Sequence, residues 1–272
     1  SIAIGYQALK ANNSNSMTAV GYLALKANTS GTETVAVGPW AGQSQTTASK
    51  NVYIGSSCGS SATTSSSNVG IGADVLQNII DTGYQTAVGA FSMRDTTSGY
   101  GNTAVGYAAL KSNTTGGNNV AIGYQASEPT TTGQKNSIVG YQAGAALTTG
   151  SYNNALGYQA LNAITTGERN TAIGYTALDA VTTANDNVAI GYAACVANTS
   201  GERNVAIGNY ALDANTTGIE NVAIGVYALT TGTGVSRSVA VGGYAANSVT
   251  GNYNVAIGWD AMYSASSINH SV

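Results

Sequence analysis

A glycine recurs at an almost constant interval along the whole chain, and this period constrains the fold more than any other feature. It follows a short apolar run at sixteen positions: Gly5, Gly21, Gly38, Gly55, Gly72, Gly89, Gly106, Gly123, Gly140, Gly157, Gly174, Gly191, Gly208, Gly225, Gly242 and Gly258. The first and last intervals are 16 residues, and the thirteen between them are 17. A fixed period of this kind indicates a stack of similar units, each of which buries its apolar side chains against its neighbours.

The residues before each repeat glycine carry a strand signal. The residue directly before it is Ile, Val or Leu in all sixteen copies, and Val or Ile often stands two places earlier, as in Val120, Ala121, Ile122 and Gly123. This alternation of β-branched residues is typical of a strand. We expect the two large residues to face a continuous core. We expect the residue between them, which is Ala in thirteen copies, to lie on the opposite face, where a neighbouring chain could pack closely.

The segment after the glycine usually holds an aromatic residue, a variable residue, Ala and then Leu, as in Gly157 to Leu161. We expect a second short strand here, with a single helical turn as the alternative. The glycine itself should form a corner where a side chain would clash or where φ must be positive. The Thr, Ser and Gly residues that follow this segment predict turns. An Asn four residues before the glycine, such as Asn119 and Asn136, predicts a ladder of amides that bond from coil to coil.

These patterns together predict an all-β fold. We expect a parallel β-solenoid of the β-roll type, built from sixteen 17-residue coils and forming a single domain over residues 1–272. Cys58 and Cys195 lie eight periods apart, about 38 Å at the parallel-strand spacing, which is too far for a disulfide. Both are expected to replace the Ala or Leu of their repeats as small buried groups.

The composition excludes several classes of protein. Only 8% of the residues are charged and the net charge is −3 with no basic tract, which leaves nothing for nucleic-acid binding through phosphate neutralisation. No apolar run approaches the roughly 18 to 20 residues that cross a bilayer. The chain starts at Ser1, inside a repeat and without Met, so we interpret it as part of a longer protein.

The recurring string Asn-Val-Ala-Ile-Gly, at Asn119 to Gly123, Asn187 to Gly191 and Asn204 to Gly208, resembles the head repeats of YadA-like trimeric autotransporter adhesins. The longer form Gly-Tyr-Gln-Ala-Leu, at Gly5 to Leu9 and Gly157 to Leu161, is similar to repeats in phage and cyanophage tail-fibre proteins. The resemblance covers essentially the whole chain. It implies a left-handed parallel β-roll, three chains about a threefold axis and a binding role.

One aromatic row is the candidate recognition surface: Tyr107, Tyr124, Tyr141, Tyr158, Tyr175 and Tyr192. Outward, stacked tyrosines could offer flat faces and hydroxyls to a cell-surface glycan or protein receptor. A ladder that stabilises neighbouring coils or covers a subunit interface is the alternative. From Gly208 onward the aromatic residue moves one place along, to Tyr210, Tyr227 and Tyr244, so the surface there should differ.

Residues for catalysis or metal binding do not converge in this sequence. His270 is the single histidine, and we expect it to be a solvated residue of the C-terminal tail. The 12 Asp and Glu residues are scattered, and the Gly- and Asp-rich calcium nonapeptide is absent. We therefore predict no enzyme activity, no cofactor and no metal site.

The sequence thus favours an extracellular, cell-surface or virion fibre segment that mediates attachment as a homotrimer, without nucleic-acid binding or membrane insertion. A self-assembling extracellular filament is the first alternative, because roll ends could stack. An ice-binding protein is the second, because Thr recurs in a row that includes Thr165, Thr182 and Thr199.

Overall fold

The computed structural model describes residues 1–264 and 268–271, and it is an all-β solenoid with coils of about 17 residues. Each coil contributes one three-residue strand. The strands are β1 (Ile2–Ile4), β2 (Thr18–Val20), β3 (Val35–Val37), β4 (Val52–Ile54), β5 (Val69–Ile71), β6 (Thr86–Val88), β7 (Thr103–Val105), β8 (Val120–Ile122), β9 (Ser137–Val139), β10 (Asn154–Leu156), β11 (Thr171–Ile173), β12 (Val188–Ile190), β13 (Val205–Ile207), β14 (Val222–Ile224), β15 (Val239–Val241) and β16 (Val255–Ile257). The predicted parallel β-solenoid is therefore confirmed.

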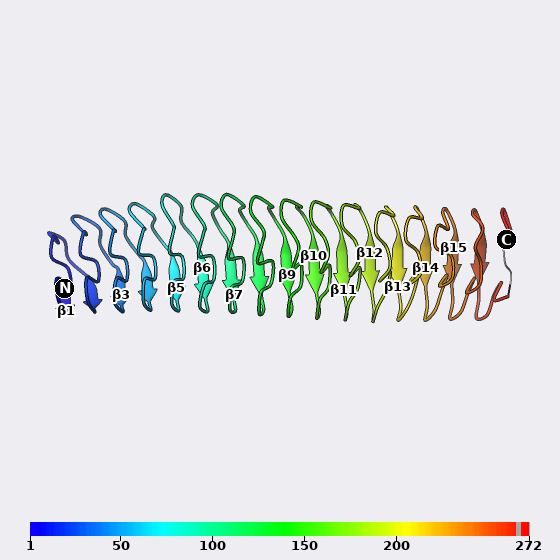
Figure 1. Ribbon diagram of the computed structural model, residues 1–272, viewed down its shortest axis with the longest axis horizontal. Helices are drawn as coiled ribbons and strands as arrows, with labels where there is room; N and C mark the ends of the chain where they lie inside the picture. Colours follow the sequence, from blue (N-terminus) through cyan, green and yellow to red (C-terminus); the bar gives the residue numbers. More distant parts are fainter. Residues whose placement is uncertain (265–267, 272) are drawn as a thin grey trace. The chain divides into compact units, whose positions relative to one another are not determined.

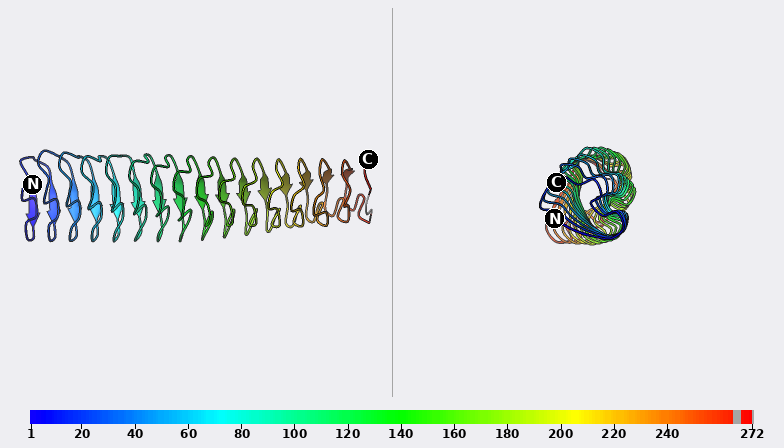
Figure 2. Two further views of the ribbon diagram at one scale, coloured as in Figure 1. Left: turned by 45° about the horizontal axis from the view of Figure 1, so that its top comes forward. Right: turned by 90° about the vertical axis from the view of Figure 1, so that its left-hand side faces the viewer.

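The chain divides into two compact units, Ser1–Asn136 with β1 to β8 and Ser137–Val272 with β9 to β16. Within each unit, successive strands pair in parallel and in register, so that equivalent residues of neighbouring coils lie side by side (Figure 1). In the first unit Ala104 lies opposite Ala121, and in the second Ala189 lies opposite Ala206. The backbone of each coil passes once around its core (Figure 2, right). Every position of the repeat therefore becomes a row of like residues in each unit.

The prediction of which strand face is buried was wrong. The middle residue of the strand points into the coil, since Ala121, Ala189 and Ala206 are fully buried. The flanking residues point outward, and Ile122 and Ile173 each keep 38% of their surface exposed. The physical reason is the narrow interior of a 17-residue coil. The adjacent Ala and Leu of the opposite segment, such as Ala177 and Leu178, already fill it, and only a small strand residue fits against them.

The second predicted strand was also wrong, and so was its helical alternative. The segment after the repeat glycine is a run of tight turns: the N–H of Ala126 donates to the carbonyl of Gly123 at 3.4 Å, and the N–H of Glu128 to that of Gln125 at 3.4 Å. Gln125 and Ser127 have φ of 52° and 53°. Successive residues of a strand point to opposite faces, whereas the adjacent Ala126 and Ser127 are both buried, as are Ala177 and Leu178 in the second unit. Turn geometry allows both to point inward.

The repeat glycine forms a corner, and both predicted reasons apply: its φ is positive and a side chain would clash. Gly174 has a φ of 140°, which L-residues rarely adopt. A Cβ on Gly174 would lie 2.2 Å from the carbonyl oxygen of Gly191 in the next coil. The glycines stack too closely for any side chain, which explains their regular recurrence.

The predicted asparagine ladder is confirmed and buried. In the second unit, Asn187 donates its amide to the side-chain oxygen of Asn170 at 3.2 Å and to the carbonyl of Gly201 at 2.9 Å. Its own side-chain oxygen accepts the backbone N–H of Asn204 at 3.0 Å. Gln85 holds the same position in the first unit, where its side-chain oxygen accepts the N–H of Asn102 at 3.1 Å. These bonds satisfy buried polar groups and fix the register between coils.

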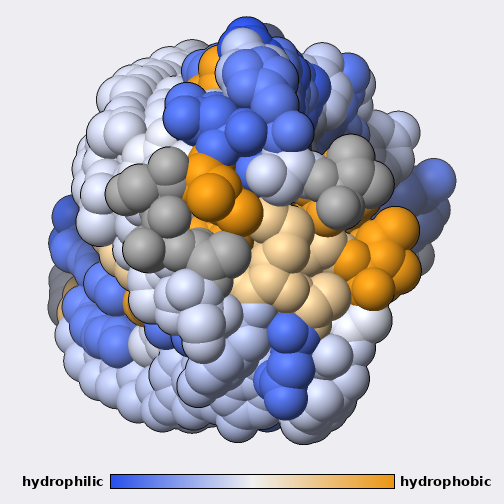
Figure 3. Space-filling view, turned by 90° about the vertical axis from the view of Figure 1, so that its right-hand side faces the viewer, coloured by the Kyte–Doolittle hydropathy of each residue, from blue (hydrophilic) through white to orange (hydrophobic). Residues whose placement is uncertain are grey.

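Both cysteines are buried and unpaired, as expected. Burial raises the pKa of the Cys58 thiol to about 12 and that of Cys195 likewise to about 12. Thiolate formation is therefore suppressed at neutral pH, and these groups act as core residues. Seen from the end of the second unit, apolar residues lie across the middle of the coil and reach its margin on one side, and pale or hydrophilic residues make up most of the remaining rim (Figure 3).

Candidate functional site

The tyrosine row predicted from the sequence lies on the surface. Each of its side chains directly follows a repeat glycine, at the corner where the chain leaves the sheet, and keeps between 41% and 46% of its surface exposed. In the first unit Tyr107 stacks on Tyr124, with ring centroids 5.3 Å apart. In the second unit Tyr141, Tyr158, Tyr175 and Tyr192 stack in sequence at 5.0 to 5.2 Å, with their ring planes within 6° of parallel.

This stacking decides what the row can offer to a ligand. In the continuous stack of the second unit, the faces of the inner rings Tyr158 and Tyr175 each lie against a neighbouring ring. Ring edges and hydroxyl groups therefore make up much of the surface along the stack, while flat faces open only where the stack is interrupted. Ring stacking also adds to the cohesion between coils.

The surface changes where the sequence predicted that it would. Tyr210 meets Tyr192 at an interplanar angle of 61°, while Tyr210, Tyr227 and Tyr244 stack on one another at 5.0 and 5.3 Å. The shift of one residue starts a second stack beside the first. Val226, the residue that now directly follows its repeat glycine, is 41% exposed.

The outer sheet face, meaning the first and third residues of every strand, is a surface that the sequence reasoning missed. Its third position is Ile, Val or Leu in each of the sixteen strands, and none of these side chains is buried. Its first position is Val in four of the eight strands of the first unit and in five of the eight strands of the second. A hollow of about 190 Å³ interrupts it in the second unit, where Ser137 and Asn154 replace Val beside Val139, Leu156 and Ile173. The repeated Ala at the middle position was the signal that could have identified this face as the outer one.

The threonine row is bound into the backbone of the turns. Thr165 donates its hydroxyl to the carbonyl oxygen of Thr182 at 3.0 Å, and Thr199 donates to that of Thr216 at 3.1 Å. The same bond recurs in the first unit, from Thr114 to Thr131 at 3.1 Å. These hydroxyl protons are used within the molecule instead of being presented to water.

Charged residues in the second unit form a row of alternating sign at the fifth position before the repeat glycine. Arg169 pairs with Asp186 at 2.7 Å, and Glu220 accepts from both Arg203 and Arg237 at 3.2 and 2.8 Å. The hydrogen bond from Arg169 lowers the pKa of Asp186, and that from Arg237 lowers the pKa of Glu220. The charges compensate one another, so this row presents no patch of a single sign. His270 is exposed, as expected, and stacks on Tyr253 at 4.7 Å.

Side chains that could bind a metal ion do not gather in residues 1–264 and 268–271. No group of three or more His, Cys, Asp or Glu residues in these ranges could hold a metal ion. A search of the same residues for a helix long and apolar enough to cross a membrane also finds none.

Comparison of the chain with protein-family models, with curated proteins and with solved structures gave no match.

Proposed function

We propose that this chain is a non-enzymatic segment of an extracellular or virion fibre that mediates surface attachment and associates with itself as a homotrimer. The observation that carries this proposal is the exposure of apolar side chains along the outer sheet face. In each unit the third strand position forms a continuous row of Ile, Val and Leu that stands partly exposed along the sheet.

An apolar stripe of this kind favours a protein partner. Monomeric soluble proteins rarely expose contiguous apolar patches beyond a few hundred Å². The Ile, Val and Leu side chains of this stripe are all branched, they stand in register and they repeat once per coil. Packing such faces together would bury the apolar rows and stabilise the assembly.

A second copy of the same chain is the partner that fits best. Its stripe has the same spacing between rows, so the side chains of two copies could interdigitate along the whole length of a unit. The number three follows from the resemblance to YadA-like head repeats. In such an assembly the tyrosine row, which lies beyond the glycine corner, would remain available for attachment.

Sedimentation velocity tests the self-association with two matched variants. The first carries four lysines on the outer sheet face, at Ile54→Lys, Ile122→Lys, Ile173→Lys and Ile224→Lys. The second carries four lysines on exposed turns, at Thr64→Lys, Thr115→Lys, Thr166→Lys and Thr217→Lys. Circular dichroism of each variant verifies that the solenoid is still folded.

The natural chain and the turn variant should sediment at three times the 27.2 kDa of one chain, and the sheet-face variant should sediment as a monomer. A natural chain that sediments as a monomer would refute the trimer. Binding of the labelled protein to arrays of glycans and cell-surface proteins tests attachment, and an absence of any bound target would count against that role.

A further inference from the structure

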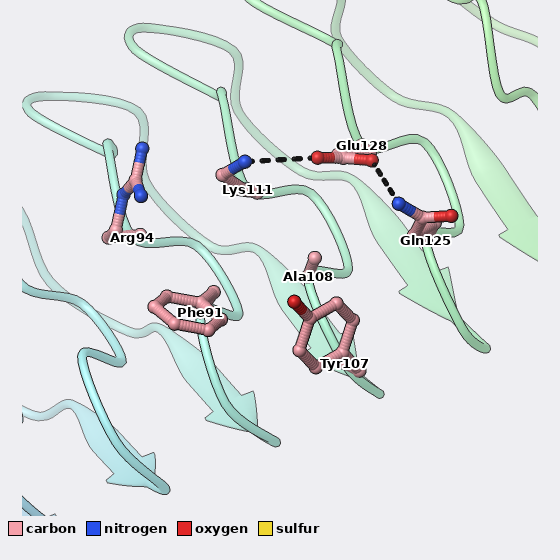
Figure 4. Close-up of a pocket in the computed structure, with 7 residues that line it drawn as sticks. All are labelled: Phe91, Arg94, Tyr107, Ala108, Lys111, Gln125 and Glu128. Carbon is pink, nitrogen blue, oxygen red and sulfur yellow. Dashed lines mark hydrogen bonds and ion pairs between the residues drawn. The ribbon is translucent and has the colours of Figure 1, made fainter.

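A hollow of about 230 Å³ opens in the first unit at one point beside the tyrosine row (Figure 4). It lies over Ala108, the second residue after its repeat glycine, which is 2% exposed. The equivalent residues of the two neighbouring coils are the larger Phe91 and Gln125. The hollow therefore arises from a small residue between two large ones at the same position of the repeat.

One wall of the hollow is aromatic. Phe91 and Tyr107 have their ring centroids 5.7 Å apart and their planes at 85°. Nearly perpendicular rings do not cover each other face to face, in contrast to the parallel pair of Tyr107 and Tyr124. The guanidinium carbon of Arg94 lies 6.0 Å from the centre of the Phe91 ring, at the upper side of the hollow in Figure 4.

The opposite wall is polar and internally connected. Lys111 Nζ lies 3.1 Å from one oxygen of Glu128, and the side-chain amide of Gln125 donates to the other oxygen at 2.8 Å. Arg94 is held by two bonds to Asp95, at 3.0 and 2.9 Å. The wall thus presents donors and an acceptor in positions fixed by one another, with each positive charge beside a carboxylate.

We propose that this hollow binds a single neutral pyranose ring, as a terminal or branch residue of a glycan. A pyranose has an apolar surface of C–H groups that suits the wall of Phe91 and Tyr107. Its adjacent hydroxyl groups can each donate and accept, which suits the neighbouring ammonium and carboxylate of Lys111 and Glu128.

The charge and size of the hollow restrict the ligand further. Because Arg94 and Lys111 already have carboxylate partners, a charged ligand would have to compete with those pairs, whereas a neutral polyol need not. The volume lies below the range of about 300 to 1,000 Å³ for pockets that hold drug-sized ligands, so one ring fits better than several. This inference rests on the proposed attachment function and assigns it a ligand class and a place.

Filling the hollow tests the proposal directly. Ala108→Gln introduces a glutamine at a repeat position where other coils already carry one, at Gln7, Gln142 and Gln159. These glutamines have a φ near 50°, as Ala108 does, so the backbone can accept the substitution. Ala193→Gln is the matched control, because Ala193 is the equivalent residue of a coil in the second unit and has a φ of 50°. Folding of both variants is verified by circular dichroism and sedimentation.

Saturation-transfer NMR is then recorded with a panel of methyl glycopyranosides of glucose, mannose and galactose, and with glucuronate. At least one neutral glycoside should bind the natural chain and the Ala193→Gln variant, and Ala108→Gln should weaken that binding about tenfold or more. Three outcomes would overturn the assignment: no neutral glycoside binds, binding survives in the Ala108→Gln variant, or glucuronate binds more tightly than every neutral sugar. A trimer that persists alongside any of these outcomes would leave the self-association intact and reject only the sugar site.

Discussion

Tyr53 and Gly59 form a complementary pair inside one coil of the first unit. Tyr53 replaces the small middle residue of its strand and is fully buried, and a Cβ on Gly59 would lie 2.5 Å from Cε1 of its ring. Gly59 stands where half of the coils have Leu, with a φ of 59° close to the 51° to 54° of Leu161 and Leu178. Its backbone conformation is therefore one that Leu also adopts here, and the glycine is needed for space.

Gly59→Ala should destabilise the solenoid by overpacking the core against the Tyr53 ring. We expect a loss of about 1–3 kcal/mol in the free energy of unfolding, measured by chemical denaturation. Gly144→Ala is the control, because a Cβ there would meet Ile138 at an ordinary 3.4 Å and should cost much less. Equal losses in the two variants would show that the Tyr53 ring is not the cause.

Gly174→Ala should be among the most damaging single changes in the chain. Its Cβ would lie 2.2 Å from a backbone oxygen of the next coil, and its φ of 140° is unsuited to alanine. We expect a loss of about 3 kcal/mol or more. Gly234→Ala provides the comparison, since its Cβ would meet only Thr217 Oγ1 at 3.5 Å. A melting temperature for Gly174→Ala equal to that of Gly234→Ala would contradict the stacked-glycine corner.

Asn187→Ala should break the ladder at a buried position. The substitution leaves the buried N–H of Asn204 without its partner, at a cost of about 1–3 kcal/mol. The carbonyl of Gly201 loses one of two donors and keeps the side-chain amide of Asn198 at 2.9 Å. Asn187→Gln should retain more stability, because Gln85 performs the same role in the first unit. Thermal unfolding of the two variants compares them, and a Gln variant no more stable than the Ala variant would argue against the ladder as the cause.

Asp179→Asn should stabilise the protein at neutral pH and not at pH 3. Burial raises the pKa of Asp179 in the folded state, and one of its side-chain oxygens is buried without a hydrogen-bond partner. A raised folded pKa means that the ionised carboxylate disfavours folding, so the stability present at low pH is lost as the pH rises through that pKa.

Asp186→Asn should show the opposite dependence on pH. Its pKa is lowered by Arg169, so its contribution is present above the unfolded pKa and is lost as the pH falls through the folded one. Melting temperatures of both variants at pH 3 and pH 7 measure the two signs. The effect of Asp186→Asn should be small, because its ion pair is exposed. Changes of the same sign in both variants would refute this assignment.

The sequence was sufficient to predict the features that depend on the period and on residue type. It was insufficient to predict the features that depend on the space available inside a coil. The glycine corner and the Asn ladder through Asn187 follow from recurrence, because stacking brings like residues together. The prediction of which strand face is buried was wrong because β-branched residues normally mark a core. The correcting signal was present in the chain: where the middle strand residue is large, as at Tyr53 and Ile138, the Leu position of the same coil is glycine, at Gly59 and Gly144.

The sequence pattern could not predict the conformation of the segment after the repeat glycine or the hollow over Ala108. Adjacent Ala and Leu, as in Ala109 and Leu110, are compatible with several local structures until both are seen to be buried. The hollow depends on the orientation of Phe91, Tyr107 and Lys111 across two coils, which residue identity alone does not determine.

We propose that the outer sheet face is an interface between copies of this chain. A cryo-EM map of the purified protein tests it most directly. We expect three chains around a threefold axis, with Ile122 and Ile224 in the interface and the tyrosine row exposed. Single chains with a solvent-exposed sheet face, or chains that meet through the tyrosine row, would contradict it.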